Sequence, residues 1–176
     1  MGELGCDTVA VDLLVRRASP ADARLVAEVY VASWNEGFAG LMPPRVADRE
    51  QVDRWERDLD DGPVRWWLAQ DGHRVLGFVG TGPSRDPIDA DLGELDTIAV
   101  APSAWRRGVG RCLMRAALDD LLEAHHREGI LWTLAEYGQG RKFCEATGWR
   151  AYGEVRDAGR QIAFRRSLMV PPTRGP

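Results

Sequence analysis

The sequence predicts one mixed α/β (α+β) domain in which seven strands and about four helices follow one another along the chain. Segments of strand-like and helix-like periodicity alternate, and no repeat, linker or low-complexity stretch divides the 176 residues. A chain of this length suits a single domain with one sizeable hydrophobic core. We expect that domain to cover residues 11–168, between a flexible N-terminus at 1–10 and a flexible tail at 169–176.

The first half of the chain is predicted to fold as strand, two helices, hairpin and strand. Ser19 followed by Pro20 is typical of a helix start, because serine caps free N–H groups and proline fits the first turn. The charged segment 45–59 has apolar residues at helical spacing, which predicts a second helix. Asp71 and Gly72 are a hairpin-turn pair. The expected elements are a strand at 11–17, a helix from 20 to about 34–37, a helix at 45–59, and strands at 64–69, 74–80 and 92–100.

The second half alternates again, beginning with a long amphipathic helix. Its apolar stripe, at i, i+4 and i+8, indicates a face packed on the core. We expect Gly129 to end that helix, because glycine is the commonest residue just past a helix C-terminus. The stripe comprises Leu113, Met114, Ala117, Leu118, Leu121 and Leu122. The remaining elements are expected to be a strand at 130–134, a short helix at 139–147, and strands beginning near 148 and at 160–165.

Composition excludes several classes of protein. The fractions of 44% apolar and 28% charged residues are those of a soluble globular protein. A net charge of −4 argues against a general nucleic-acid binder, which needs a basic face. No stretch approaches the ~20 apolar residues that span a bilayer. The N-terminus lacks a secretory signal, and the three cysteines and three histidines show no metal-binding spacing, so we expect a cytoplasmic protein without a metal.

The most informative segment is residues 105–111, Trp-Arg-Arg-Gly-Val-Gly-Arg, between a predicted strand and a predicted helix. Backbone N–H groups at a helix N-terminus can hold a phosphate, while glycines admit close approach and arginines add charge. A P-loop is excluded because Gly108 and Gly110 are too close and no lysine follows. A dinucleotide fingerprint is excluded because Leu113 stands where the third small residue is required. The segment therefore predicts binding of a phosphorylated small molecule of another kind.

The remaining pattern, Arg/Trp-x-x-Gly-x-Gly between strand and helix, resembles that of the GNAT superfamily of acyl-CoA-dependent N-acetyltransferases. A second signature of that family, Phe-Tyr-Glu-x-x-Gly-Phe, is similar to the segment 143–149, Phe-Cys-Glu-Ala-Thr-Gly-Trp. Three positions depart from the family pattern. Trp105 stands for Gln/Arg, Cys144 for the family tyrosine, and Tyr137 for the usual asparagine. The resemblance covers about 11–168 and implies a mixed, mostly antiparallel sheet.

The resemblance also implies the cofactor, acetyl-CoA or coenzyme A acting as the acyl-donor substrate. Its pantetheine would lie along the fourth strand, which would splay away from the fifth, and its diphosphate would lie on the glycine loop. The candidate coenzyme-binding residues are Ile98, Ala99, Val100, Trp105, Arg106, Arg107, Gly108, Val109, Gly110, Arg111, Tyr137 and Arg141. The implied reaction is direct transfer of an acetyl group to a primary amine of a small molecule or peptide in a ternary complex. No covalent acyl-enzyme is expected, because no cysteine or serine adjoins a credible histidine base.

Acetyl transfer needs a base for the acceptor amine and, optionally, an acid for the departing thiolate. Glu94 is the first candidate base, and Asp96 lies on the same strand face by strict alternation, although a bulge could re-aim either carboxylate. For the acid, Cys144, Tyr137 and no acid at all stay open, since a thiol pKa near ~8.5 makes the demand modest. The acceptor pocket of the family corresponds to Trp34, Glu36 and Phe38.

Two other functions remain as alternatives. The chain could be a catalytically weak acyl-CoA-binding sensor or partner module, which the missing family tyrosine favours. It could also bind a different nucleotide, such as ATP or NAD. We expect no nucleic-acid or membrane partner, and a homodimer formed through an edge strand is compatible with the sequence.

Overall fold

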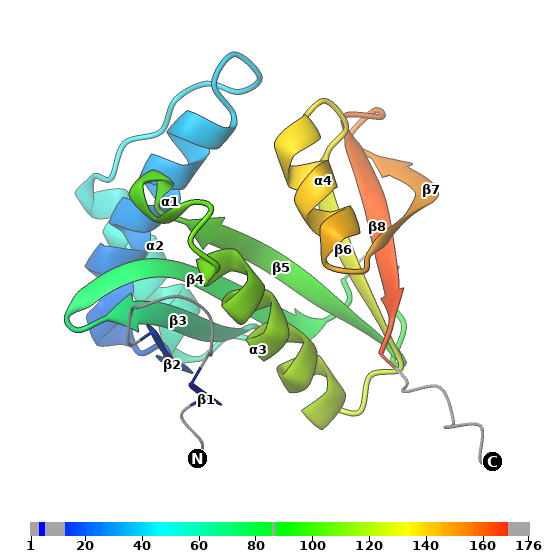
Figure 1. The fold of residues 1–176 in the computed structure, drawn as a ribbon, viewed down its shortest axis with the longest axis horizontal. Helices are drawn as coiled ribbons and strands as arrows, with labels where there is room; N and C mark the ends of the chain where they lie inside the picture. Colours follow the sequence, from blue (N-terminus) through cyan, green and yellow to red (C-terminus); the bar gives the residue numbers. More distant parts are fainter. Residues whose placement is uncertain (1–3, 6–12, 86, 169–176) are drawn as a thin grey trace.

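The computed structural model describes residues 4–5, 13–85 and 87–168, which form one sheet with helices on both faces (Figure 1). The strand order is β1-β2-β3-β4-β5-β6-β8-β7, and only the β5–β6 pair is parallel. The elements are β1 (Leu4–Gly5), β2 (Leu13–Arg17), η1 (Pro20–Asp22), α1 (Ala23–Gly37), α2 (Arg49–Asp60), β3 (Arg65–Asp71), β4 (Arg74–Pro83), β5 (Leu92–Val100), η2 (Pro102–Ala104), α3 (Val109–Glu123), β6 (Glu128–Leu134), α4 (Gly138–Ala146), β7 (Arg150–Arg156) and β8 (Gln161–Ser167).

The predicted fold class is confirmed: the seven expected strands form a mixed, mostly antiparallel sheet, and the two-residue β1 adds an eighth at the β2 edge. The four expected α-helices are present among the described residues. Apart from residues 4–5, the predicted flexible N-terminus at 1–10 and the tail at 169–176 lie outside the described residues.

Two predicted helix boundaries are wrong. The second helix begins at Arg49, not at residue 45, because the Asp48 side chain accepts a hydrogen bond from the Gln51 N–H at 2.9 Å and caps the helix there. Helix α3 ends at Glu123, and Gly129 lies inside β6 instead of ending the helix. A Cβ at Gly129 would approach the Trp149 ring to 2.9 Å, so the glycine is explained by close packing across the sheet.

The helices divide between the two faces of the sheet. Leu95 of β5 and Leu131 of β6 pack in the core against α3 and α4, together with buried Leu113 and Cys144. On the other face, Phe78 of β4 packs with α1 and α2. The sheet therefore separates an α3/α4 face from an α1/α2 face.

The pairing of β5 with β6 is incomplete. It covers Leu92–Leu95 against Glu128–Leu131, whereas β5 continues to Val100 and β6 to Leu134. Beyond the paired part the two strands diverge, as the ribbon shows (Figure 1). The predicted splay between these strands is thus present, and we call the place where β5 and β6 separate the opening.

A bulge interrupts β5 at the edge of this opening. The register to β4 passes from Leu95↔Thr81 to Thr97↔Gly80, so Asp96 has no partner of its own. Leu95 and Ile98, three residues apart, both pack on the α3 face, which strict alternation would forbid. The bulge therefore changes the direction of side chains next to the candidate base.

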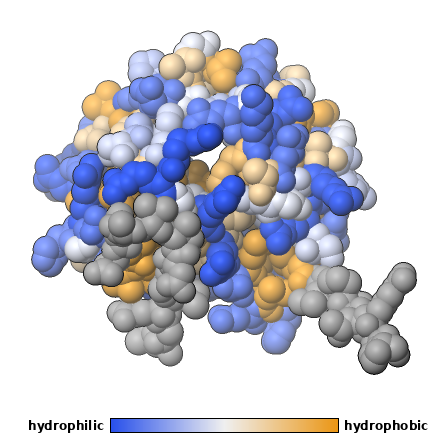
Figure 2. All heavy atoms as spheres, in the orientation of Figure 1, coloured by the Kyte–Doolittle hydropathy of each residue, from blue (hydrophilic) through white to orange (hydrophobic). Residues whose placement is uncertain are grey.

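No helix among the described residues is long and apolar enough to cross a membrane. On the face seen in Figure 2, hydrophilic residues predominate and hydrophobic ones are scattered between them.

Candidate functional site

The glycine loop has a backbone that suits an anion. Arg106 and Gly108 have φ of +61° and +85°, so left-handed residues flank Arg107. Alternation of this kind turns successive N–H groups toward one concavity. Helix α3 starts directly afterwards, with Gly108 at its N-cap and no capping side chain. Open N–H groups and the positive end of the helix dipole therefore meet at one place.

The side chains of the loop support that geometry. Arg106, Arg107 and Arg111 are exposed to solvent around the loop. Gly108 has open space where a Cβ would be, whereas a Cβ at Gly110 would come within 3.2 Å of the Phe143 ring. Gly108 is thus needed for its positive φ, whereas Gly110 is needed because it allows α4 to pack closely against the start of α3.

Trp105, which departs from the family pattern, has a structural role. Its indole N–H donates to the Val100 carbonyl at 2.7 Å and ties the loop to the end of β5. The Ala101 N–H bonds the Leu76 carbonyl of β4, so by alternation the main-chain groups of Ile98 and Val100 face the opening. The Trp105 indole thus occupies the Val100 carbonyl, and the other main-chain groups of Ile98 and Val100 that face the opening remain available for hydrogen bonds.

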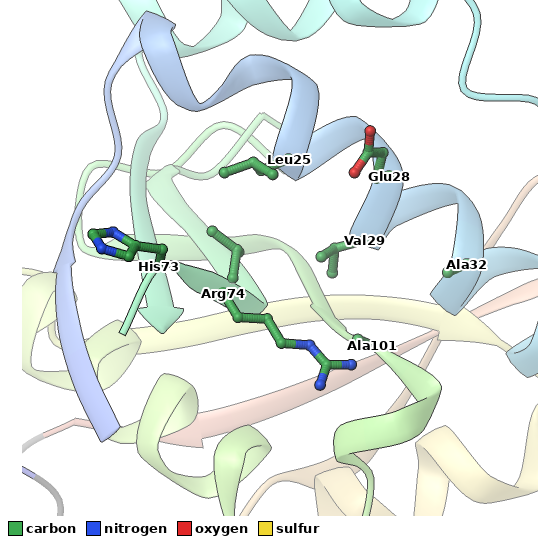
Figure 3. Close-up of a pocket in the computed structure, with 8 residues that line it drawn as sticks. Leu25, Glu28, Val29, Ala32, His73, Arg74 and Ala101 are labelled. Carbon is green, nitrogen blue, oxygen red and sulfur yellow. The ribbon is translucent and has the colours of Figure 1, made fainter. Parts of the chain in front are cut away.

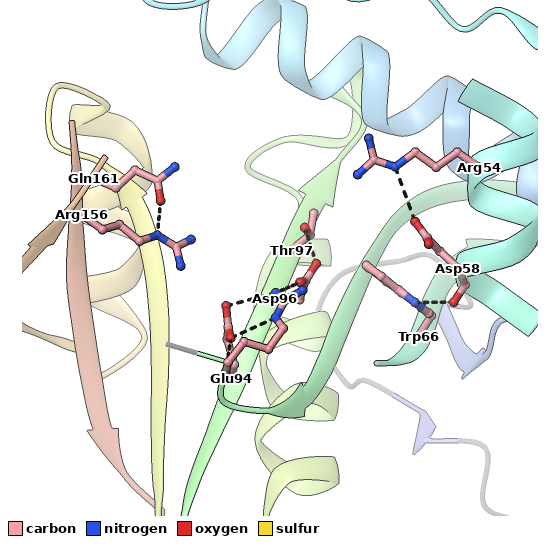
Figure 4. Close-up of polar contacts among 9 residues, drawn as sticks. Arg54, Asp58, Trp66, Glu94, Asp96, Thr97, Arg156 and Gln161 are labelled. Atoms are coloured by element: carbon pink, nitrogen blue, oxygen red, sulfur yellow. Dashed lines mark hydrogen bonds and ion pairs between the residues drawn. The ribbon is translucent and has the colours of Figure 1, made fainter. Parts of the chain in front are cut away.

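The two candidate carboxylates, Glu94 and Asp96, share one arginine, Arg85; Figure 4 shows the two carboxylates near each other on β5. Glu94 is only 3% exposed, and its oxygens accept from the Arg85 backbone N–H at 3.1 Å and from the Arg85 guanidinium at 3.2 Å. The same guanidinium contacts Asp96. These bonds raise the pKa of Arg85, chiefly through Glu94. Glu94 and Asp96 therefore lie close together at the β5 bulge, as a pair bound by one partly exposed arginine.

The candidate acids differ in environment. Burial raises the pKa of the Cys144 thiol to about 12, and the side chain lies in the core between α3 and α4. Tyr137 is half-buried and precedes α4; burial, and to a smaller extent nearby Cys144, raise its pKa. The Tyr137 ring packs edge-on against Phe38 at 4.7 Å between centroids. Tyr137 thus joins the end of α1 to the start of α4 across the opening.

The predicted acceptor residues lie at the end of α1. Trp34 packs against Phe38 at 4.8 Å and donates its indole N–H to the Pro43 carbonyl at 3.0 Å. Glu36 is exposed and forms no ion pair with any residue that the structure describes. The guanidinium carbon of Arg45 lies over the Trp34 ring, 3.7 Å from its centroid. Trp34 and Phe38 are therefore brought together at the mouth of the opening, whereas Glu36 is not drawn into that cluster.

Arg141 lies on α4, on the far side of the opening from the glycine loop. Its Nη1 donates to the Ala135 carbonyl at 3.2 Å, and its buried Nε has no hydrogen-bond partner in the described part of the chain. Arg141 is thus held toward the end of β6 with one donor to spare.

Sequence reasoning missed several cationic groups around the opening. Arg85 comes from the β4–β5 loop, Arg45 from the α1–α2 loop and Arg156 from the end of β7. The sequence around each of these arginines contains no recognisable motif. They come near β5 only because segments far apart in the chain pack together.

A further cavity, of about 500 Å³, lies away from the opening, between α1 and the β3–β4 turn (Figure 3). Glu28, Val29, His73 and Arg74 are among the residues that line it. It contains none of the predicted site residues. No group of three or more His, Cys, Asp or Glu side chains placed to hold a metal occurs in residues 4–5, 13–85 and 87–168.

Comparison with known proteins gives a family and relatives. The model of the "Acetyltransferase (GNAT) family" matches residues 26–149. The uncharacterized N-acetyltransferase YuaI of Bacillus subtilis is 28% identical over 127 residues, which are 69% of this chain and 72% of YuaI. The mycothiol acetyltransferase of Acidimicrobium ferrooxidans is 35% identical over 92 residues, which are 52% of this chain but only 29% of that protein.

A solved structure shows the same fold. The PaiA N-acetyltransferase of Thermoplasma acidophilum, in complex with coenzyme A, superposes with a TM-score of 0.69 at 18% identity. The match covers 88% of this chain and 98% of that one. The strand order and the helix placement described above are therefore those of a known architecture.

Proposed function

Because this chain belongs to the acetyltransferase (GNAT) family, we propose that it transfers an acetyl group from acetyl-CoA to a primary amine of a small molecule or peptide. The observation that carries the proposal is the place where β5 leaves β6 beside the uncapped start of α3. A long thin molecule with a diphosphate at one end fits this combination of an opening and an anion-binding loop.

The glycine loop supports coenzyme A as the acyl donor. N–H groups of Gly108, Val109 and Gly110 would bind the diphosphate, and exposed Arg106, Arg107 and Arg111 would add charge. Free main-chain groups at Ile98–Val100 would pair with the pantetheine amides, as another strand would. PaiA is described in complex with coenzyme A, which supports the same ligand for this chain.

The chemistry assigned to the carboxylates is removal of a proton from the acceptor amine. The amine nitrogen attacks the thioester carbonyl carbon, a C–N bond forms, the C–S bond breaks and the thiolate leaves. Glu94, at the β5 bulge, takes the proton that the nitrogen loses. The Arg85 side chain is 57% exposed, so it can swing away from Glu94 when a cationic acceptor arrives.

Acetyl-CoA binding is tested by thermal shift with acetyl-CoA, CoA, ATP and NAD at matched concentrations. We expect acetyl-CoA and CoA alone to stabilise the protein, by ~2.7 kcal/mol at a hundredfold excess over Kd. Gly108→Ala should raise the Kd about tenfold, because a strain of ~1–2 kcal/mol at positive φ moves the loop amides.

The matched control is Gly153→Ala, at a φ of +86° on β7 with open space around it. It should lose similar stability and keep normal CoA affinity. No shift with acetyl-CoA or CoA for the folded wild type would refute the proposal. Binding without turnover of any amine would favour an acyl-CoA sensor instead.

We propose Tyr137 over Cys144 as the group that protonates the thiolate. A thiol with a pKa of about 12 gives its proton to a thiolate of pKa ~8.5 at a cost of ~5 kcal/mol. Burial also raises the pKa of the Tyr137 hydroxyl above the ordinary tyrosine value of ~10, so the choice of Tyr137 rests on its place: it is half-buried beside Phe38, whereas Cys144 lies in the core. Cys144→Ala should therefore keep kcat within about twofold, whereas Tyr137→Phe should lower it about tenfold, measured by release of free CoA thiol. Equal kcat values for Tyr137→Phe and wild type would show that no acid is needed.

A further inference from the structure

Arg156 is an arginine that the proposed reaction does not use, and two contacts hold its side chain at the opening. Its guanidinium lies over the Trp132 ring at 4.4 Å from the centroid, and its Nε donates to Gln161 Oε1 at 2.6 Å. Stacking on an indole and one hydrogen bond fix the plane of the guanidinium and leave its terminal nitrogens unused.

Arg156 is on the same face of the sheet as Glu94. Trp132 packs with Leu92, Ile130 and Ala163, and Leu92 lies two residues before Glu94 in a regular part of β5. Side chains two residues apart on a strand share a face. Figure 4 shows Arg156 and Gln161 on one side of the gap, with the guanidinium directed toward Glu94 and Asp96 on the other side.

Among the described residues, Arg156 forms no ion pair. No carboxylate lies within 4.0 Å of its guanidinium in the parts of the chain that the structure describes. Arg165, on the adjacent β8, differs in this respect, because it pairs with both Glu128 at 3.0 Å and Glu154 at 2.9 Å. A stacked arginine that faces an opening without a counter-ion is suited to bind the anion of a ligand.

We propose that Arg156 binds a carboxylate carried by the acceptor, while the acceptor amine lies at Glu94 and Asp96. This rests on the acetyl transfer proposed above and names its substrate class: amines that also carry a carboxylate, as amino acids do. The acidic pair and the arginine lie on opposite sides of the gap, so they attract the two ends of such a zwitterion. The planar guanidinium can give a carboxylate two parallel hydrogen bonds, which an amide or a methyl group cannot accept equally.

The test uses the full chain with acetyl-CoA and a panel of the L-amino acids, measured by thiol release. The best acceptor is then compared with its carboxamide and its decarboxylated amine, and O-phosphoethanolamine serves as a phosphate-bearing arm. We expect the amino acid to be preferred about 10- to 100-fold in kcat/KM, the range typical of hydrogen bonds to charged groups. Preference for O-phosphoethanolamine would overturn the assignment of a carboxylate.

Arg156→Gln should raise the KM of the amino acid about 10- to 100-fold with little change in kcat, and should leave the carboxamide unaffected. Arg156→Lys should raise the KM less than Arg156→Gln does, because lysine keeps the positive charge but cannot form the two parallel hydrogen bonds of a guanidinium. Arg150→Gln, on the same strand and exposed, is the matched control and should change neither constant. Calorimetric binding of the amino acid in the presence of CoA gives a second readout that needs no turnover.

Equal effects of Arg156→Gln on the amino acid and its carboxamide would overturn the proposal, as would a KM effect at Arg45→Gln with none at Arg156. Turnover of amines regardless of a carboxylate would refute this inference and leave acetyl transfer intact. Absence of acetyl-CoA binding would refute acetyl transfer itself.

Discussion

Replacing Glu94 by glutamine is expected to lower kcat/KM for the amine acceptor by about 10²- to 10³-fold at neutral pH. Glutamine has nearly the same shape, and its one amide oxygen can still accept from the Arg85 backbone N–H, while the hydrogen bond from the Arg85 guanidinium to the other oxygen is lost. What is lost is the ability to take a proton from the attacking nitrogen. The measurement is initial rates of thiol release over a range of acceptor concentrations.

Asp96→Asn is the matched comparison, because Asp96 contacts the same Arg85 guanidinium and lies two residues away. It should reduce kcat/KM less than Glu94→Gln does. Both variants should keep the wild-type thermal shift with acetyl-CoA, since neither residue contacts the glycine loop in the proposed complex. Wild-type kcat/KM in Glu94→Gln, or a larger loss in Asp96→Asn, would remove Glu94 as the base.

Asp120→Ala is expected to destabilise the fold strongly, by about 3–5 kcal/mol. Asp120 lies on α3 and is only 4% exposed. It accepts from Arg65 Nε at 2.8 Å and Nη2 at 2.7 Å, and the Thr81 hydroxyl of β4 also donates to it. The substitution leaves the Arg65 charge and a buried hydroxyl without their acceptor.

For a chain of this length the loss corresponds to a fall in Tm of about 6–20 °C, measured by calorimetry or circular dichroism. Asp119→Ala, on the same turn of α3, is the control. Asp119 is half-buried, and its substitution should lower the free energy of unfolding by less than ~1 kcal/mol. A Tm for Asp120→Ala equal to that of Asp119→Ala would show that the network contributes little.

Local features of the chain were sufficient for the order of elements. β5 begins and ends at the residues expected, Leu92 and Val100, because its apolar residues and the polar, turn-forming segments that flank it can be recognised in the sequence itself. The position of Gly108 in the loop could likewise be recognised from its residue type, since its φ of +85° is a conformation that glycine adopts without strain. The glycine loop and helix α3 could therefore be located without knowledge of any tertiary contact.

The ends of helices were harder to predict from the sequence than the order of the elements. Gly129 has the residue type of a helix stop, yet the Trp149 ring that packs on it comes from twenty residues further along the chain. Helix α2 begins at Arg49 because the Asp48 side chain folds back on its own backbone, a choice that apolar periodicity does not report.

The sequence by itself determined the α/β order and the position of the candidate coenzyme loop, both of which depend on residue type and spacing over short distances. Only the tertiary structure decided how the site is completed. The bulge at Asp96, the Arg85 cation between two carboxylates and the Arg156–Trp132 stack across the gap each join segments far apart in the chain. These arrangements depend on the register of the strands and on where β5 leaves β6, and neither quantity has a local signature in the sequence.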